Sequence, residues 1–249
     1  MFCPRCTDTL EIVLLRGKME EVELPVDKVD IIISEWMGYF LLYESMLDTV
    51  VYARDRYLAP GGTIMPNRAS MLITAIEDAQ YKEEKIHFWD NVYGFDMSSI
   101  KPWAMQEPLV DVVEPKAVVG SECAFKEIDI MTVTKEDLVF TAAFDITMQR
   151  SDYVHALLAY FNIDFCSEGM KPIRFATGPR DRYTHWKQTA FYLPNDLQVQ
   201  AGDVLRGSLS CKPNARNPRD LDIAIACRLF DSSGLAKEEE GQHYDYHMC

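Results

Sequence analysis

Short apolar runs near the start of the chain predict an α/β unit. Leu10–Leu15 and Val29–Ile33 are such runs, and the second is dense in β-branched residues, as is typical of parallel strands buried on both faces. Over Leu41–Leu58 apolar residues recur at helical spacing, and Pro60-Gly61-Gly62 is predicted to end this helix before a strand at Thr63–Met65. The order strand, helix, strand predicts a βαβ unit.

Beyond Pro66 the hydrophobic pattern changes to alternation. Apolar residues occupy every second position through most of Leu138–Met148, Leu157–Phe165 and Leu221–Leu229. A period of two is typical of antiparallel strands with one buried face, and turns rich in Gly, Pro and Asn separate these segments. We therefore predict a second, all-β domain over residues 67–249 that closes as a barrel or a sandwich.

An aromatic stripe interrupts the alternation. Glu77–Tyr93 has a helical pattern, and its aromatic residues, followed by Phe95, form one stripe. Two interpretations stay open. The stripe is ordinary core, or it is a protruding contact arm inserted between the strands of the barrel.

Composition narrows the class of protein. The chain has 249 residues, 48% of them hydrophobic, and a formal net charge of −14, which suits a buried core and excludes a disordered chain. No apolar run approaches the about 20 residues of a membrane helix, so we expect no membrane partner. The acidity favours a basic protein or peptide over nucleic acid as the partner. Seven scattered cysteines do not resemble a disulfide framework and favour a reducing cytosol or nucleus.

The segment from Ser34 to Met46 is the most informative for chemistry. Glu35 directly follows a buried type of strand, at the carboxyl end where open α/β sheets bind ligands. Glu44 is expected just inside the following helix, and Gly38 allows a tight return between the two glutamates. Such carboxylates can form an acid/base pair, a metal site or a clamp for a cation, and the clamp suits the planar donor fork of a guanidinium. The alternative is a pair of capping or solvated glutamates.

Other candidates carry weaker signals. His185 lies in a turn between barrel strands, where a histidine is more often structural than catalytic. Cys3-Pro4-Arg5-Cys6 resembles half of a zinc or redox site, but no second cysteine pair or nearby histidine completes it. His243 and His247 have i,i+4 spacing, and a solvated tail explains them better than a metal site.

Together these segments resemble the protein arginine N-methyltransferases, in particular the type I branch that makes asymmetric dimethylarginine. The similarity runs from about Leu10 nearly to the C-terminus. The segments that carry it are the double-glutamate loop Ser34–Leu47, the Thr-His-Trp loop Tyr183–Gln188, the adenine-contacting segment Gly17–Val22, the post-helix turn Leu58–Gly62 and the dimerisation arm Glu77–Phe95.

The resemblance implies an α/β plus all-β fold. Residues 1–66 would be the C-terminal half of a Rossmann-like S-adenosylmethionine methyltransferase domain, followed over 67–249 by a β-barrel substrate-binding domain with a helical arm at about 77–112. Leu10–Leu15 would be the family's third strand and Val29–Ile33 its fourth. The glycine-rich loop and the ribose-binding acidic residue would precede Leu10, and no Gly-x-Gly-x-x-Gly occurs here. We therefore expect an N-terminally truncated chain that alone is inactive and binds S-adenosylmethionine weakly or not at all.

The resemblance also implies an activity and a location. The implied reaction transfers a methyl group from S-adenosylmethionine to arginine guanidinium groups of histones or Arg/Gly-rich proteins, in the cytoplasm and nucleus. The implied catalytic residues are Glu35, Glu44 and His185, the cofactor-binding residues Glu20, Met19 and Met46, and the substrate-pocket residues Tyr39 and Trp186; no metal is implied.

Two functions from different classes stay open. The first is an arginine methyltransferase whose missing half lies upstream or comes from another chain. The second is a non-catalytic relative that binds partners through the barrel and the arm. A homodimer through the 77–112 arm is implied but doubtful, because the helices on which the family's arm docks are not found in this sequence.

Overall fold

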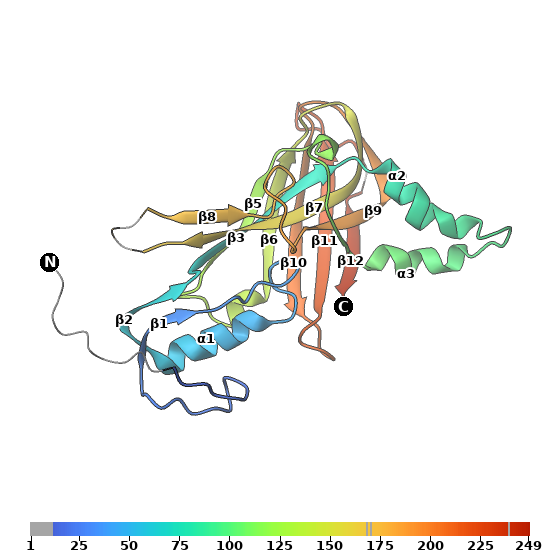
Figure 1. The fold of residues 1–249 in the computed structure, drawn as a ribbon. Coiled ribbons are helices and arrows are strands. Elements are labelled where there is room, and N and C mark those ends of the chain that lie inside the picture. Colours follow the sequence, from blue (N-terminus) through green and yellow to red (C-terminus); the bar gives the residue numbers. More distant parts are fainter. Residues whose placement is uncertain (1–11, 168, 170, 239) are drawn as a thin grey trace.

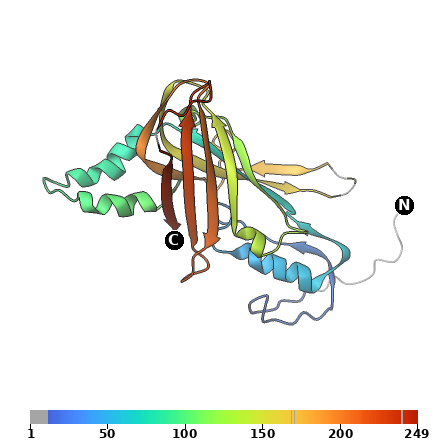
Figure 2. The same ribbon diagram turned by 180° about the vertical axis from the view of Figure 1, so that it is seen from behind.

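The fold places a small parallel sheet beside two antiparallel sheets. The computed structural model describes residues 12–167, 169, 171–238 and 240–249. Figure 1 shows the parallel pair with its helix at one end of the molecule, the antiparallel sheets in the middle and a helical arm at the other end, and Figure 2 shows the same arrangement from behind. The expected combination of an α/β unit and an all-β domain is confirmed. No helix in the described part of the chain is long and apolar enough to cross a membrane.

The α/β unit has the predicted order of elements. It consists of β1 (Val29–Ile33), α1 (Met46–Tyr57) and β2 (Leu58–Met65), with β1 and β2 parallel. The prediction that Pro60-Gly61-Gly62 separates the helix from the strand was wrong, because β2 begins directly after α1. The register of the two strands shifts at this point, and Gly61 has a φ of 79°. The turn residues therefore form a bulge inside the strand, which glycine accommodates without steric cost.

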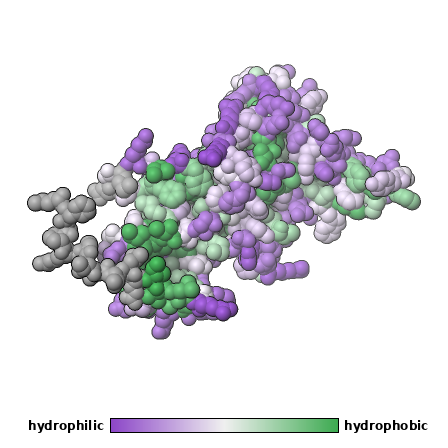
Figure 3. Space-filling view, viewed as in Figure 1, coloured by the Kyte–Doolittle hydropathy of each residue, from purple (hydrophilic) through white to green (hydrophobic). Residues whose placement is uncertain are grey.

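The predicted strand over Leu10–Leu15 was also wrong. Its first two residues lie outside the described residues, and Ile12–Leu15 forms no strand. Leu14 is 93% exposed and Ile33 of β1 is 80% exposed, and Figure 3 shows apolar surface at the end of the molecule that holds the α/β unit. A strand needs a neighbour to pair its backbone donors and acceptors. Within the described residues β1 pairs with β2 alone and Ile12–Leu15 pairs with no strand, so the apolar run stays outside the sheet.

Two antiparallel sheets make up most of the remaining chain. One has the strand order β12-β11-β10-β6, and the other has the order β4-β9-β7-β3-β5 with β8 beside β7. The three alternating segments of the sequence are strands, as predicted. The bounds are β3 (Arg68–Ile76), β4 (Leu109–Asp111), β5 (Cys123–Asp129), β6 (Phe140–Thr147), β7 (Asp152–Phe165), β8 (Ile173–Ala176), β9 (Gln188–Val199), β10 (Val204–Pro213), β11 (Leu221–Phe230) and β12 (Gln242–Met248).

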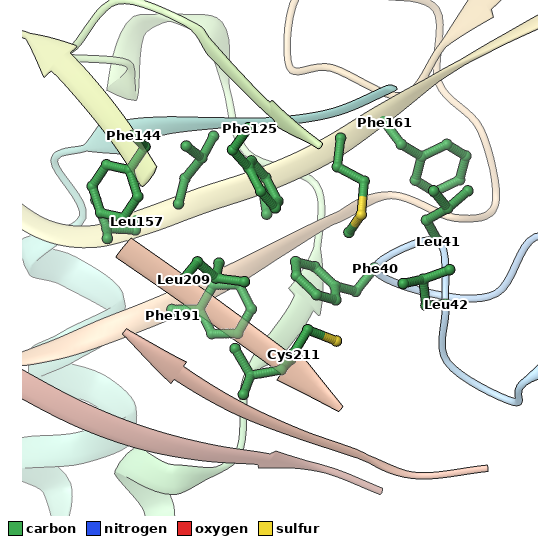
Figure 4. Close-up of a cluster of buried hydrophobic side chains, with 14 of the residues drawn as sticks. Phe40, Leu41, Leu42, Phe125, Phe144, Leu157, Phe161, Phe191, Leu209 and Cys211 are labelled. Atoms are coloured by element: carbon green, nitrogen blue, oxygen red, sulfur yellow. The ribbon is translucent and has the colours of Figure 1, made fainter. Parts of the chain in front are cut away.

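The inner faces of both sheets share one hydrophobic core. Figure 4 shows Phe144 and Leu209 of one sheet near Leu157 and Phe191 of the other. Phe40, from the loop between β1 and α1, enters the same core and meets Phe191 edge to face, with ring centroids 5.4 Å apart. Because this loop is part of the common core, the α/β unit and the sheets hold it from both sides.

A helical arm leaves the sheets after β3. It rises through α2 (Ala79–Tyr81), a π-helical turn over Lys82–Ile86 and a 3-10 turn over His87–Asp90, and returns through a 3-10 turn over Ser98–Ile100 and α3 (Lys101–Gln106). Figures 1 and 2 both show it protruding from the molecule.

Each of the two interpretations of the aromatic stripe holds for one part of it. At the base of the arm, Tyr81 stacks on Tyr192 of β9 with ring centroids 4.8 Å apart. The buried ammonium group of Lys82 donates to the backbone carbonyl of Leu193 at 2.6 Å and pairs with Asp196. The tip is different, because Tyr93 is 91% exposed. The base of the stripe is therefore core, and its tip is free surface.

Candidate active site

The chain between β1 and α1 forms a tight loop that requires glycine at one position. Gly38 and Leu41 form an antiparallel bridge, in which the Gly38 N–H donates to the Leu41 carbonyl at 2.9 Å. A Cβ atom at Gly38 would lie 1.9 Å from the carbonyl oxygen of Tyr43. Four other residues of the loop, among them Phe40 and Glu44, have φ values between 49° and 76°, a region that side chains other than glycine rarely adopt. Gly38 therefore permits the predicted tight return.

Packing compensates for this unfavourable backbone. Trp36, Phe40 and Leu41 are among the most buried side chains of the molecule, and Figure 4 shows Phe40, Leu41 and Leu42 pointing into the core. Left-handed residues cost roughly 1–2 kcal/mol each and persist only where surrounding structure enforces them. Such strain is typical of functional sites, and the residues at the two ends of this loop are Glu35 and Glu44.

Glu35 lies where the sequence placed it. It follows the end of β1 by two residues, and the Ser34 N–H extends the pairing with β2 by donating to the Met65 carbonyl at 3.2 Å. The Glu35 side chain is exposed, and its carboxylate has no hydrogen-bonding or ion-pair partner among the described residues. A carboxylate held at the rigid end of a strand, with its acceptor oxygens open, is available to bind a cation.

Glu44 is not inside the helix, which corrects the prediction. It has a left-handed φ of 76° and precedes the N-cap residue Ser45, and α1 starts only at Met46. The left-handed backbone ends the tight loop and cannot continue as an α-helix, so the helix begins one turn later than its apolar pattern indicates. The Glu44 carboxylate accepts a hydrogen bond from Nη2 of Arg219 at 2.8 Å.

Trp186 connects the sheets to the loop. Its indole N–H donates to the backbone carbonyl of Met37 at 2.8 Å, and its ring stacks on Phe175 with centroids 5.5 Å apart. His185 packs directly against Trp186, with ring centroids 3.9 Å apart, and remains exposed. The structure therefore brings the Thr-His-Trp loop to the segment that follows Glu35, and Trp186 makes the hydrogen bond between the two.

The three predicted cofactor residues lie beside α1. Thr49 of the helix donates to the Glu20 carboxylate at 2.8 Å, and this hydrogen bond is the main reason that the pKa of Glu20 lies below its ordinary value. Met46 lies three residues before Thr49, so both side chains belong to one face of the helix. Met19 adjoins Glu20 in a turn closed by the Glu21 N–H, which donates to the Lys18 carbonyl at 3.0 Å.

Tyr39 lies on the side of the loop that faces the arm. Its ring is parallel to that of Tyr43, with centroids 6.4 Å apart. Both line a cavity of about 520 Å³ whose other walls include Tyr81 and Trp89 of the arm. Partial burial raises the pKa of Tyr43, so its phenol stays neutral and can donate a hydrogen bond. The pocket beside the loop is thus lined by aromatic rings.

Two of the weaker candidates remain without a function. Cys3 and Cys6 lie outside the described residues. His243 and His247 lie on β12 and pair with acidic neighbours, Asp245 at 3.3 Å and Asp222 at 3.1 Å. In the part of the chain that the structure describes, no three His, Cys, Asp or Glu side chains gather as metal ligands would.

The sequence did not predict the contact between Arg219 and Glu44. Arg219 lies in the turn between β10 and β11, 175 residues after Glu44 in the chain. No local pattern distinguishes it from Arg216, the other arginine of that turn. Its role depends on the barrel folding back onto the loop, and only the three-dimensional structure reveals such a contact.

Comparison with known proteins gives consistent matches. The model of the arginine methyltransferase oligomerization subdomain matches residues 67–232. Protein arginine N-methyltransferase 1 of Schizosaccharomyces pombe is 56% identical over 238 residues, which cover 96% of this chain and 69% of that protein. The protein of the same name from Chlamydomonas reinhardtii is 56% identical, over 92% of this chain and 66% of that protein.

A solved structure agrees with these matches. It is the Trypanosoma brucei PRMT1 enzyme-prozyme heterotetrameric complex with AdoHcy, which is 41% identical and superposes with a TM-score of 0.88 over 95% of this chain and 73% of that chain. The present chain thus spans about two thirds of the length of the curated relatives that it matches.

Proposed function

This chain belongs to the protein arginine N-methyltransferase family, and on that basis we propose that it takes part in methyl transfer from S-adenosylmethionine to the guanidinium group of arginine in proteins. The observation that carries the proposal is the loop that only Gly38 can close. It returns the chain on itself, so that Glu35 and Glu44 stand at the two ends of one hairpin-like turn. Both side chains are exposed, and carboxylates are the groups that the planar donor fork of a guanidinium binds.

The clamp supplies both binding and activation. An arginine side chain is always protonated near neutral pH, and its nitrogens are then poor nucleophiles. Hydrogen bonds to Glu35 and Glu44 draw the positive charge toward the nitrogens that face them. The remaining nitrogen keeps more electron density and is aimed by the same contacts. The protein mainly positions the reactants and stabilises the developing charge. In well-oriented systems positioning lowers the activation barrier by up to about 7–11 kcal/mol.

His185 is proposed as the third catalytic residue. The attacking nitrogen loses a proton when it gains the methyl group, and a neutral imidazole can accept one. The support is positional: His185 packs on Trp186, whose indole is hydrogen-bonded to the segment just after Glu35. Exchange of His185 for Gln is expected to lower methyl transfer in a radiolabelled-methyl assay, because the glutamine amide is not a base that can accept this proton.

S-adenosylmethionine is the proposed methyl donor. The Trypanosoma brucei relative was solved with AdoHcy. In the present chain Glu20, Met19 and Met46 would contact the donor beside α1. They fit this role, because the lowered pKa of Glu20 keeps it an ionised acceptor for amino or hydroxyl groups and Met46 offers a polarisable apolar surface. The donor supplies a methyl group that its sulfonium already activates.

Substrate, product and location are proposed on coarser grounds. The net charge of −14 attracts basic segments, as found in histones and Arg/Gly-rich proteins. The resemblance to the type I branch favours asymmetric dimethylarginine as the product. The proposed location is the cytoplasm and nucleus, where such substrates occur.

A homodimer through the arm is proposed as the assembly. The family model that matches the chain describes an oligomerization subdomain. Tyr93 and Phe95 expose large aromatic side chains at the tip of the arm, and exposed aromatic residues are typical of protein interfaces. Sedimentation velocity of the full-length protein is expected to show a dimer that Phe95→Ser weakens. Tyr153→Ser, an exposed aromatic on β7, serves as the control and leaves the dimer intact.

A methyl-transfer assay separates catalysis from mere binding. The full-length protein is mixed with radiolabelled S-adenosylmethionine and an Arg/Gly-rich peptide, and with the same peptide in which every Arg is Lys. We expect label on the arginine peptide alone and asymmetric dimethylarginine after hydrolysis. The exposed arm supports the second candidate, a non-catalytic protein-binding module. Peptide binding without label transfer would favour that module and refute the enzyme.

A further inference from the structure

We propose that Arg219 is a positioning residue, which fixes one oxygen of Glu44 so that the other faces the substrate guanidinium. The inference rests on the proposed function, because Glu44 matters only as part of the clamp. Its basis is the ion pair between Arg219 Nη2 and Glu44 Oε1 at 2.8 Å. Within the described residues Oε2 of Glu44 has no such partner.

Hydrogen bonds within the turn that carries Arg219 hold its conformation. The Asn214 side-chain carbonyl accepts from the backbone N–H groups of Arg216 at 2.8 Å and Asn217 at 3.2 Å. The Asn217 side chain in turn donates to Asp220 at 2.9 Å and accepts from the Arg219 N–H at 3.3 Å. These contacts close a compact turn without any help from the loop between β1 and α1.

The turn is also tied to the barrel sheet. The amide of Asn214 donates to the Asp222 carboxylate on β11 at 2.8 Å, and His247 on β12 lies 3.1 Å from the same carboxylate oxygen. Asp222 therefore connects the turn to two neighbouring strands. Arg219 is thus presented from a fixed frame, which is what a residue needs if it is to orient another side chain.

Three contacts join this turn to the end of the clamp loop. The Glu44 N–H donates to the Arg219 carbonyl at 2.8 Å, the Ser45 hydroxyl donates to the Pro218 carbonyl, and the Arg219 guanidinium holds the Glu44 carboxylate. Glu44 and Ser45 both have left-handed backbones. The two backbone carbonyls keep this strained pair in place, while the guanidinium orients the carboxylate itself.

The arrangement separates orientation from stability. Both side chains of the pair are largely exposed, 65% for Arg219 and 44% for Glu44, and ion pairs of that kind contribute little to folding. A single N–H contact leaves half of the carboxylate free, where a bidentate one would use both oxygens. In this geometry Arg219 binds one oxygen of Glu44 and leaves the other free for the substrate guanidinium. Arg219 therefore does not block the site.

The test uses matched variants of the full-length protein. Arg219→Ala removes the support, Arg219→Lys keeps the charge, and Arg216→Ala makes the same charge change three residues away in the same turn. We expect Arg219→Ala to lower kcat about 10- to 100-fold with little change in KM, as misplacement of a catalytic group does. Arg219→Lys should recover part of the loss, and Arg216→Ala should behave as wild type.

A second readout does not depend on activity. The carbon-13 signal of the Glu44 carboxylate is expected to shift in Arg219→Ala and to stay unchanged in Arg216→Ala, because only the Arg219 guanidinium contacts that group. Amide hydrogen exchange over residues 40–47 should stay unchanged in both variants, because the backbone carbonyls that hold the loop remain. Equal activity and an equal Glu44 signal in the two alanine variants would overturn the proposal. A faster reaction in Arg219→Ala would also overturn it, because Arg219 would then be an occupant of the site. If wild type transfers no methyl group at all, the proposed function fails, and the Glu44 signal alone decides whether Arg219 holds the carboxylate.

Discussion

Two neighbouring segments, the loop over residues 34–45 and the apolar residues of Ile12–Leu15 and β1, show opposite relations between sequence and structure. The loop is polar at both ends, yet it sends Trp36 and Leu41 into the core and is tied to distant parts of the chain. The second group is rich in Val, Leu and Ile, yet Leu14 is 93% and Ile33 is 80% exposed, and Figure 3 shows apolar surface at the end of the molecule that holds the α/β unit. Hydrophobicity alone does not predict burial in either segment. What differs is whether another element of the described chain covers the residues.

The largest effect is expected at Gly38, because a new side chain would collide with backbone that cannot move. Its Cβ would lie 1.9 Å from the Tyr43 carbonyl oxygen. We expect Gly38→Ala to lower the free energy of unfolding by at least about 3 kcal/mol and to abolish methyl transfer. Chemical denaturation and the radiolabel assay measure the two effects.

Gly94→Ala is the control for that variant. Gly94 also has a positive φ, but a Cβ there would meet nothing within 4 Å. Its cost should stay near about 1 kcal/mol. Equal losses at the two positions would show that backbone conformation, and not the close approach inside the loop, governs the effect.

A pair of alanine substitutions tests the comparison of the two regions directly. Leu41 is fully buried and Ile33 is 80% exposed. We expect Leu41→Ala to cost about 3 kcal/mol, because it leaves a cavity in the common core, and Ile33→Ala to cost less than about 0.5 kcal/mol. Urea denaturation of the 249-residue chain measures both. A large loss for Ile33→Ala would mean that an element covers β1 in solution.

A smaller, pH-dependent effect is expected at Asp222. Hydrogen bonding from Asn214, followed by interaction with His247, lowers the pKa of Asp222 below its ordinary value. A carboxyl group with a lowered folded-state pKa stabilises the fold above its unfolded pKa of about 3.9 and loses that contribution as the pH falls through its folded value. Asp222→Asn should therefore cost about 1 kcal/mol at pH 7 and progressively less below about pH 4.

Asp245→Asn, the same charge change on the neighbouring strand, is the control for Asp222. Thermal unfolding from pH 7 down to pH 3 compares the two variants with wild type. A difference between Asp222→Asn and wild type that stays constant over this range would argue against the titration of Asp222 as its cause.

Much of this architecture could be predicted from local patterns. The alternation of β6, β7 and β11 and the helical spacing of α1 report burial that these residues achieve. The β-branched run of β1 predicts the strand correctly but not its burial, because Ile31 and Ile33 are exposed. The wrong strand prediction over Leu10–Leu15 has a physical cause. An apolar run predicts a strand only if a partner exists, and Ile12–Leu15 has none among the described residues.

The candidate site shows the same limit. Gly38 and the two glutamates stand out within a dozen consecutive residues, so a short motif is enough to find them. The start of α1 could not be predicted, because the left-handed residues Glu44 and Ser45 precede it and bond to the carbonyls of Arg219 and Pro218, far away in the chain. Contacts between residues so far apart in sequence leave no local pattern.

The guanidinium clamp is tested most directly by Glu35→Gln in the full-length protein. Glutamine keeps the size of the side chain and one acceptor oxygen but removes the charge. Since Glu35 is exposed and makes no ion pair among the described residues, the melting temperature of the Glu35→Gln variant should equal that of wild type. Methyl transfer to an arginine peptide should fall at least about 100-fold, as expected when a charge-stabilising group is lost. Glu83→Gln, on the exposed side of the arm, should be fully active, and near-normal transfer by Glu35→Gln would contradict the clamp.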